Sequence, residues 1–234
     1  MIRAQLRYFD VDRHIQRVMI TSADTGEGKS LISLNLARAA ARTDEKRALL
    51  IEADLRRPSL HKMIARDSIA GLAELLSHSQ DLETGLRELV VTPDQMRDEQ
   101  SLHLDVLLAG STPPNPAELL ESRRMGALLE AADSIYDIVI IDTPPIGVVS
   151  DAIPLVHQVD GLLVINRMGI SRRDHALRLM KRFRSLNANI LGVVVNSFRA
   201  PDDSGNGYYK YTRTGTDGSI RRGLRTRQRI ARAR

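Results

Sequence analysis

The segment from Ala23 to Ser30, ADTGEGKS, combines residue types that can hold phosphate. It matches the phosphate-loop pattern G-x-x-x-x-G-K-[ST] except at its first position, where Ala23 replaces glycine. Gly26 and Gly28 would let backbone N–H groups point at phosphate oxygens. Lys29 would neutralise the terminal phosphates of a nucleotide, and Ser30 would offer its hydroxyl to Mg²⁺. A plain glycine-rich turn is the alternative, but G-x-G-K-S between a strand and a helix is uncommon by chance.

Acidic residues follow two of the apolar runs that read as strands. Asp142 ends YDIVIID and precedes the rigid TPP, while Glu52 and Asp54 end ALLIEAD and lie on the same side of an extended chain. Ligands bind at the carboxyl ends of strands in open α/β sheets, so we expect these carboxylates beside the phosphate loop. Acidic residues also close strands without any function. Together with Lys29 and Ser30, they predict a nucleotide and Mg²⁺ site, with Asp142 in the inner or outer coordination sphere of the metal.

The elements that must position these residues alternate between apolar runs and helical patterns, which is typical of a parallel sheet with crossover helices. Several runs are almost continuous Val, Ile and Leu, as strands covered on both faces require. We therefore predict an α/β fold with a mostly parallel sheet and helices on both faces. The predicted strands are Val18–Thr21, Ala48–Glu52, Leu104–Leu108, Ile138–Ile141, Leu162–Ile165 and Leu191–Val195, and the predicted helices are about 29–42, 71–78, 117–132, 151–158 and 172–186.

The composition fits one soluble domain. Hydrophobic residues make up 42% of the 234, enough to bury one core. The absence of cysteine excludes disulfides and thiolate metal sites, and the six histidines show no close metal-ligand spacing. The N-terminus lacks the apolar core of a signal peptide, and no run approaches the roughly 18 apolar residues that span a bilayer. We therefore expect a cytoplasmic protein.

The C-terminal segment differs from the rest of the chain. We place a domain boundary between 1–198 and a flexible tail, 199–234, because SFRAPDDSGNG is polar and rich in turn formers. Tyr208, Tyr209 and Tyr211 are three of the five tyrosines, and no apolar periodicity surrounds them. Residues 210–234 hold nine Lys or Arg and one acid, Asp217, a net charge of +8. Such a tail suits an anionic membrane surface, nucleic acid or an acidic partner, although a solvated end is the plain alternative.

Four further segments carry a family resemblance. After the GEGKS loop come, in order, LLIEADLRRPSLH, GLAELL, LDVLLAGSTPPNPAELLES and YDIVIIDTPP. In this order they resemble the bacterial tyrosine kinases that control capsule and exopolysaccharide synthesis, from about Arg3 to the tyrosine tail. The resemblance implies a P-loop NTPase of MinD/ParA-like architecture that uses ATP and Mg²⁺. It also implies γ-phosphate transfer to tyrosines, with the C-terminal cluster as the enzyme's own substrate.

The resemblance assigns roles to individual residues. Lys29, Asp54 and Asp142 would be catalytic. Asp54, which falls in the family's D-x-D-x-R segment, would contact Mg²⁺ and help deprotonate the incoming tyrosine. Ser30, Asp54 and Asp142 would bind the metal. Tyr208, Tyr209 and Tyr211 would accept phosphate. Arg56 and Arg57 are interpreted as surface charges near the site without a catalytic role. The predicted nucleotide-binding residues are Thr25, Gly26, Glu27, Gly28, Lys29, Ser30, Leu31 and Asn196, the last at the adenine.

The sequence also departs from the family pattern. Glu52 stands where aspartate is usual, which would carry its charge about one methylene further and loosen the metal geometry. Thr25 replaces a common proline, which makes the loop less rigid but removes no ligand. Of the Glu-x-x-Arg-x-x-Arg motif that the family uses in ring assembly, the sequence retains Arg3, the last arginine. The resemblance therefore leaves the assembly state open.

The implied partners are a membrane-embedded activator or polysaccharide co-polymerase subunit, further copies of the chain, and a cognate tyrosine phosphatase. We expect recruitment to the inner face of the cell membrane, and no nucleic-acid partner. Twelve residues separate Asn196 from Tyr208, a reach of about 40 Å, which allows phosphorylation within one chain or between copies. Two alternatives stay open: an ATP-binding scaffold of polysaccharide export without kinase activity, and a positioning ATPase. The second class typically carries lysine at the position of Asp24.

Overall fold

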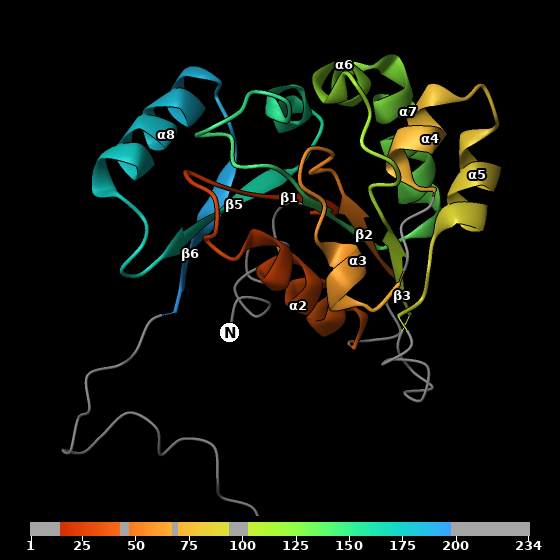
Figure 1. Ribbon diagram of the computed structural model, residues 1–234, viewed down its shortest axis with the longest axis horizontal. Coiled ribbons are helices and arrows are strands. Elements are labelled where there is room, and N and C mark those ends of the chain that lie inside the picture. Colours follow the sequence, from red (N-terminus) through yellow and green to blue (C-terminus); the bar gives the residue numbers. More distant parts are fainter. Residues whose placement is uncertain (1–14, 43–46, 67–69, 94–102, 198–234) are drawn as a thin grey trace, which may run out of the picture. The chain divides into compact units, whose positions relative to one another are not determined.

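The structure is a computed structural model that describes residues 15–42, 47–66, 70–93 and 103–197 (Figure 1). Its centre is a six-stranded parallel sheet of order β3-β2-β4-β1-β5-β6. Every predicted strand is confirmed to within about two residues. The strands are β1 (Arg17–Ser22), β2 (Ala48–Glu52), β3 (Leu104–Leu107), β4 (Ile138–Asp142), β5 (Gly161–Arg167) and β6 (Ile190–Asn196).

Helices cover both faces of the sheet, as predicted (Figure 1). Because successive strand residues point to opposite faces, the sheet divides its apolar side chains between two cores. On one face, Val18 and Leu50 pack with α2 (Lys29–Ala41) and α3 (Leu60–Met63). On the other, Met19 and Leu49 pack with the remaining helices. These are α4 (Leu72–Ser77), α5 (Leu82–Leu89), α6 (Pro116–Glu121), α7 (Arg123–Ile135), the 3-10 helix η2 (Ile153–His157) and α8 (Arg173–Ser185).

The strand order brings three carboxyl ends together. β4 lies between β2 and β1, and Asp142 is in register with Glu52 on one side and with Ile20 on the other. The loop between β1 and α2 therefore leaves the sheet beside the ends of β4 and β2. In open α/β sheets this edge is where ligands bind.

The helix predictions need four corrections. The predicted helix 117–132 is two helices, because Ser122 has an extended backbone and its hydroxyl accepts the Met125 N–H to begin α7. The one-turn α3 was missed because it is too short for a periodic pattern. The helix α5 was missed because Gly85 interrupts it, although Asp81 gives a capping signal by accepting the Thr84 N–H at 2.8 Å. The segment 151–158 contains a 3-10 helix with Pro154 near its start, not an α-helix.

Several predictions lie outside the described residues: Arg3, the boundary at 198, the basic tail and the three tyrosines Tyr208, Tyr209 and Tyr211. Within the described ranges, no helix combines the length and the apolar character needed to cross a bilayer. In those ranges no group of three or more acidic or histidine side chains is arranged to hold a metal ion by itself.

Candidate functional site

The loop between β1 and α2 has the backbone of a phosphate cradle. Gly26 and Gly28 adopt positive φ angles of 73° and 92°, a region that favours glycine. A Cβ on Gly28 would also come within 2.2 Å of the Asn196 side chain. The α2 helix begins at Lys29, so its first N–H groups point toward the loop. An anion above this loop would meet backbone donors and the positive end of the helix.

Lys29 is buried among carboxylates. The residue is 8% exposed, and burial lowers the pKa of its ammonium, an effect that Asp142, Asp54 and Glu27 oppose. Lys29 also lines a cavity of about 540 Å³ at the carboxyl edge of the sheet. A buried cation at the wall of a cavity is suited to an anionic ligand, because the ligand would replace the hydration that burial removes.

The two carboxylate oxygens of Asp142 differ in their hydrogen bonding. The Ser33 hydroxyl lies 3.0 Å from Asp142 Oδ1, while Oδ2 is buried and accepts no hydrogen bond from any described residue. Burial raises the pKa of the Asp142 carboxyl to about 7, although Ser30, Lys29 and Ser33 act in the opposite direction. A buried carboxylate oxygen without a partner, next to a serine hydroxyl, fits the oxygen ligands that Mg²⁺ requires.

Glu52 does not extend toward the proposed metal site, although the sequence suggested that it would. It is fully buried, and its Oε1 accepts the N–H groups of Ser59 and Leu60 at 2.5 and 2.6 Å. Its Oε2 accepts the Ala109 N–H at 3.2 Å. The carboxylate thereby holds the start of α3 and the segment after β3, and it does not line the cavity. The expectation that Glu52 extends toward the metal is corrected, because backbone donors occupy both of its oxygens.

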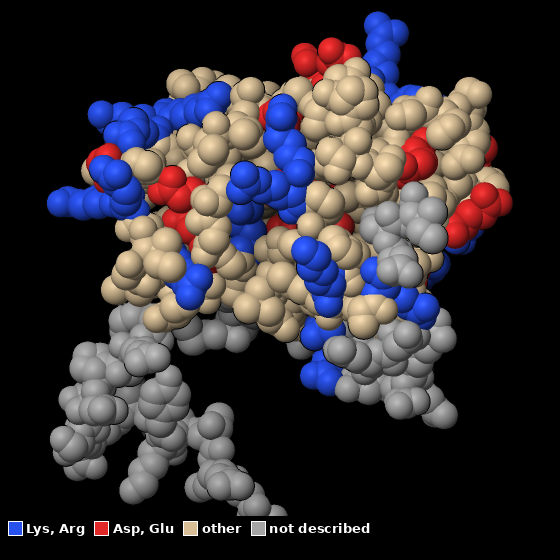
Figure 2. Space-filling model, viewed as in Figure 1, with Lys and Arg blue, Asp and Glu red and all other residues tan. Residues whose placement is uncertain are grey.

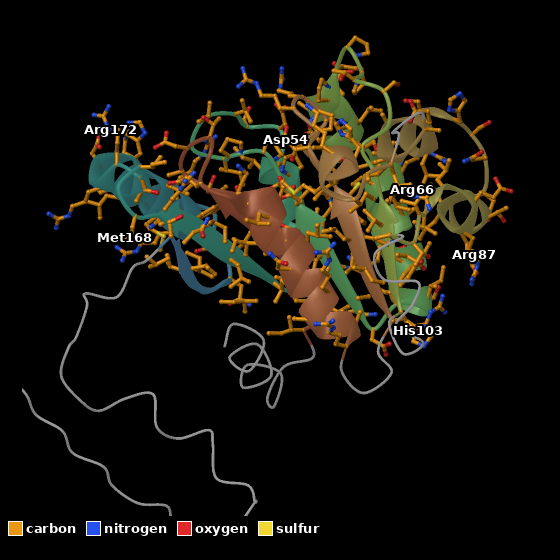
Figure 3. All side chains as sticks on the ribbon, turned by 60° about the horizontal axis from the view of Figure 1, so that its bottom comes forward. Asp54, Arg66, Arg87, His103, Met168 and Arg172 are labelled. Atoms are coloured by element: carbon orange, nitrogen blue, oxygen red, sulfur yellow. The ribbon has the colours of Figure 1, made fainter. Side chains whose placement is uncertain are left out.

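Asp54 faces the same cavity as Lys29. Its Oδ1 accepts the Arg57 N–H at 3.0 Å, and burial raises the pKa of its carboxyl despite that bond and the charge of Lys29. Figure 3 shows Asp54 near the centre of the molecule, well apart from Met168 and Arg172 at one end and Arg87 and His103 at the other. A carboxylate with a raised pKa binds a proton more strongly than an ordinary aspartate does.

Arg56 was interpreted as a surface charge, and the structure gives it a fixed partner. Its Nη2 donates to Asp151 Oδ1 at 3.1 Å, and its Nε is paired with Asp151 Oδ2. Asp151 is 3% exposed, whereas Arg56 is half exposed and lines the cavity with Arg57. Lys and Arg side chains gather across the middle of the face seen in Figure 2. Sequence reasoning missed this pair because 95 residues separate its members.

The cavity brings together most of the predicted binding residues. Its wall also includes the polar Ser59 and an apolar side that sequence reasoning did not identify, formed by Met63, Pro144, Pro145, Val148 and Val149. Glu27, Asn196 and Asp142 are not on its wall, and Asp142 lies at the end of β4, two residues before the lining residue Pro144. Glu27 is buried beneath the loop, and the Asn196 amide donates to the Glu27 carbonyl at 2.9 Å. The predicted residues that do line the cavity are Thr25, Gly26, Gly28, Lys29, Ser30, Leu31 and Asp54.

The fold and this loop define the class of protein, a P-loop nucleotide-binding protein. Residues 18–233 match the family model of the CobQ/CobB/MinD/ParA nucleotide binding domain. The kinase domain of the Escherichia coli tyrosine kinase ETK is similar in structure, with a TM-score of 0.76 and 32% identity over 88% of this chain and 78% of that chain.

Two curated relatives identify the family within this class of nucleotide-binding proteins. The chain is 38% identical to the tyrosine-protein kinase YwqD of Bacillus subtilis, over 89% of this chain and 83% of that protein. It is 30% identical to the tyrosine-protein kinase wzc of Salmonella typhi, over 90% of this chain but only 28% of that longer protein. The chain belongs to the bacterial tyrosine kinases of capsule and exopolysaccharide synthesis, as the sequence resemblance implied.

Proposed function

We propose that this chain binds Mg·ATP in the cavity at the carboxyl edge of the sheet and transfers the γ-phosphate to tyrosine hydroxyls. The observation that carries the proposal is the buried, unpartnered Asp142 Oδ2, next to Ser30 and Lys29. Ser30, Asp142 and Asp54 would hold the metal, and bound Mg²⁺ would neutralise charge on the phosphates. Lys29 and the loop N–H groups would bind the terminal phosphates from the other side.

In this proposal the protein aligns the tyrosine with the γ-phosphate and accepts one proton. The tyrosine oxygen would form the new bond to the γ-phosphorus while the bond from phosphorus to the bridging oxygen of ADP breaks. Asp54 would accept the phenolic proton. An ordinary phenol has a pKa of about 10, so a carboxylate whose pKa is raised by burial is better matched to it than a solvated aspartate.

The proposed acceptors are Tyr208, Tyr209 and Tyr211. The described part of the chain supports this choice by exclusion, because Tyr136 is 3% exposed and its hydroxyl donates to Asp105 Oδ2 at 2.9 Å. Burial and Asp105 also raise the pKa of the Tyr136 phenol above its ordinary value. Replacing the three tail tyrosines by Phe should remove most of the phosphotyrosine signal, and persistent phosphorylation at Tyr136 or Tyr8 would contradict the assignment.

The partners form part of the same proposal. We infer a homo-oligomer that phosphorylates between copies, a membrane-embedded activator or co-polymerase subunit, and a cognate phosphatase that restores the tyrosines. The tail supports a location at the inner face of the membrane, because residues 210–234 carry a net charge of +8. Each phosphate adds a charge of about −1.5 to −2, so three would offset more than half of the tail's charge and weaken its hold on an anionic surface.

The experiment that tests the proposed function compares two lysine variants. Lys29→Met removes the buried cation at the cavity, whereas Lys181→Met removes an exposed lysine of α8 and serves as the matched control. We expect Lys29→Met to abolish ATP-dependent tyrosine phosphorylation, measured by immunoblot and mass spectrometry, with no loss of fold by circular dichroism. Activity of Lys29→Met equal to that of Lys181→Met would overturn the mechanism.

A further inference from the structure

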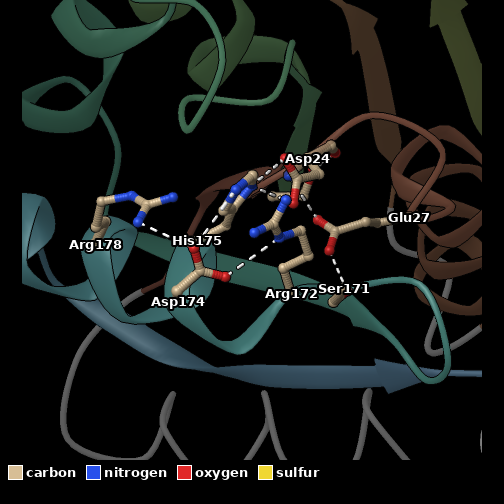
Figure 4. Close-up of polar contacts among 8 residues, drawn as sticks. Asp24, Glu27, Ser171, Arg172, Asp174, His175 and Arg178 are labelled. Carbon is tan, nitrogen blue, oxygen red and sulfur yellow. Dashed lines mark hydrogen bonds and ion pairs between the residues drawn. The ribbon is translucent and has the colours of Figure 1, made fainter.

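Two acidic residues of the phosphate loop are tied to a distant part of the chain (Figure 4). Glu27 is fully buried beneath the loop, and its Oε2 accepts the Asp24 N–H at 3.0 Å. Its Oε1 accepts the hydroxyl of Ser171, which itself accepts the Arg167 N–H at 2.6 Å. Ser171 lies in the connection between β5 and α8, so one buried carboxylate joins the loop to that connection.

The second tie is between Asp24 and His175. His175 lies in the first turn of α8, and its Nδ1 is 2.7 and 2.8 Å from the two carboxylate oxygens of Asp24. Both side chains are mostly buried, at 24% and 29% exposed. On the far side of the ring, His175 Nε2 is 3.8 Å from Asp174 Oδ2, and Asp174 is itself paired with Arg172 and Arg178. The imidazole is thus held with its Nδ1 toward the loop.

The conformation of the phosphate loop depends on contacts with residues outside the loop. Thr25 and Gly26 are exposed, Gly26 has a positive φ, and nothing lies within 4 Å of where its Cβ would be. A glycine has many accessible backbone conformations, and only those that aim the N–H groups inward bind phosphate. Further support comes from Arg167, which donates to the Gly26 carbonyl at 3.0 Å. We call Asp24, Glu27, Ser171 and His175 the loop clasp.

We propose that His175 is a positioning residue for nucleotide binding: through Asp24, and together with the bond from Ser171 to Glu27, it holds the phosphate loop in its binding conformation. This inference rests on the proposed function, because it requires nucleotide at this loop. The proposal also gives Asp24 a structural role, which is to hold the loop by its contact with His175 of the same chain. The positioning ATPases typically use lysine at this position, and here the side chain is engaged by α8 of the same molecule.

The test measures binding of Mg·ADP to the full chain by isothermal titration calorimetry, with circular dichroism as the check on folding. His175→Leu removes the donor and should weaken Mg·ADP binding about tenfold, since a charge-assisted hydrogen bond inside the structure is lost. His175→Asn places its amide N–H₂ close to where Nδ1 lies, and should restore binding to within about threefold of the original chain. His175→Gln places its amide near Nε2 instead and should remain weak.

Further variants and a kinetic measurement distinguish a positioning role of His175 from a general loss of structure. Arg173→Leu changes an exposed residue of the same helix and should bind Mg·ADP like the original chain. His175→Leu should raise the KM for ATP while kcat for phosphorylation stays within about twofold, because the clasp acts on the loop and not on the tyrosine. Asp24→Ala should give the same tenfold loss, and it alone tests the contact if His175→Leu does not fold. Where His175→Leu does fold, the double variant should lose no more affinity than either single variant.

Three results decide the inference. Equal Mg·ADP affinity in His175→Leu and the original chain would overturn the role of His175, as would equal loss in His175→Asn and His175→Leu. Failure of the original chain to bind Mg·ADP would instead overturn the proposed function. The two failures are therefore distinguishable in one set of titrations.

Discussion

Glu52 and Asp142 occupy matching places at the ends of neighbouring strands, yet the structure uses them differently. They are in register across β2 and β4, and both are almost completely buried. Glu52 accepts three backbone N–H groups, which satisfy both of its oxygens. Asp142 has the Ser33 hydroxyl on one oxygen and no described partner on the other. The unused hydrogen-bonding capacity, more than the charge or the position, marks the residue that can bind a ligand.

The largest expected effect is on catalysis at Asp142. Asp142→Asn keeps the shape but removes the anionic ligand, so tyrosine phosphorylation should fall by about a hundredfold or more. The melting temperature without nucleotide should stay the same or rise, because a buried charge is gone. Initial rates and calorimetric melting of the same preparation provide the check. A folded Asp142→Asn chain with full activity would remove Asp142 from the site.

The second effect is on stability at Glu52. Glu52→Gln turns an amide N–H₂ toward backbone donors, so the free energy of unfolding should fall by about 2–4 kcal/mol. Below its melting transition the variant should still phosphorylate tyrosine at a rate within about threefold of the original chain. Urea unfolding and initial rates measure the two quantities. Loss of activity without loss of stability would show that Glu52 acts at the metal after all.

A third prediction concerns pH. The folded-state pKa of Asp142 is raised to about 7 by burial, above an unfolded value of about 4. Between these values the folded chain binds more protons than the unfolded chain does, so the contribution of Asp142 to stability declines as pH rises from about 4 to 7. In EDTA, the stability difference between Asp142→Asn and the original chain should therefore grow in favour of the variant across this window. A constant difference would contradict the raised pKa.

The smallest effect is expected at Ser33, which is within hydrogen-bond distance of both Asp142 and the Lys29 carbonyl. Ser33→Ala leaves the Asp142 carboxylate without that donor, so its pKa should rise further and Mg·ADP should bind about threefold more weakly at pH 7. Ser134→Ala, which removes an exposed helix serine bonded only to the Ala131 carbonyl, is the matched control. Identical titrations for the two variants would show that Ser33 does not tune the carboxylate.

The sequence predicts the fold and the approximate place of the site for clear physical reasons. The near-continuous Val, Ile and Leu runs specify buried parallel strands, and parallel strands put Lys29 and Asp142 at one edge. The loop motif has a fixed relation to the helix after it, so Gly26, Gly28 and Ser30 could be named from spacing alone. Helix interruptions were less visible, since Ser122 ends one helix and begins the next within a single apolar pattern.

The side-chain partners could not be predicted. The structural role of Glu52 follows from the N–H groups of Ser59, Leu60 and Ala109 that its carboxylate accepts. No sequence pattern shows which backbone donors will lie near a given carboxylate. The same is true of His175, which meets Asp24 from 151 residues away. Such pairs depend on how α8 packs against the sheet, and packing is set by the whole core.

Tandem mass spectrometry of the full chain after incubation with ATP, with Mg²⁺ or with EDTA, tests the central claim most directly. The account predicts phosphotyrosine at Tyr208, Tyr209 or Tyr211 in the Mg²⁺ arm, none at Tyr136, and no phosphotyrosine in EDTA. Hydrolysis of ATP without any phosphotyrosine, or phosphotyrosine formed equally in EDTA, would contradict it.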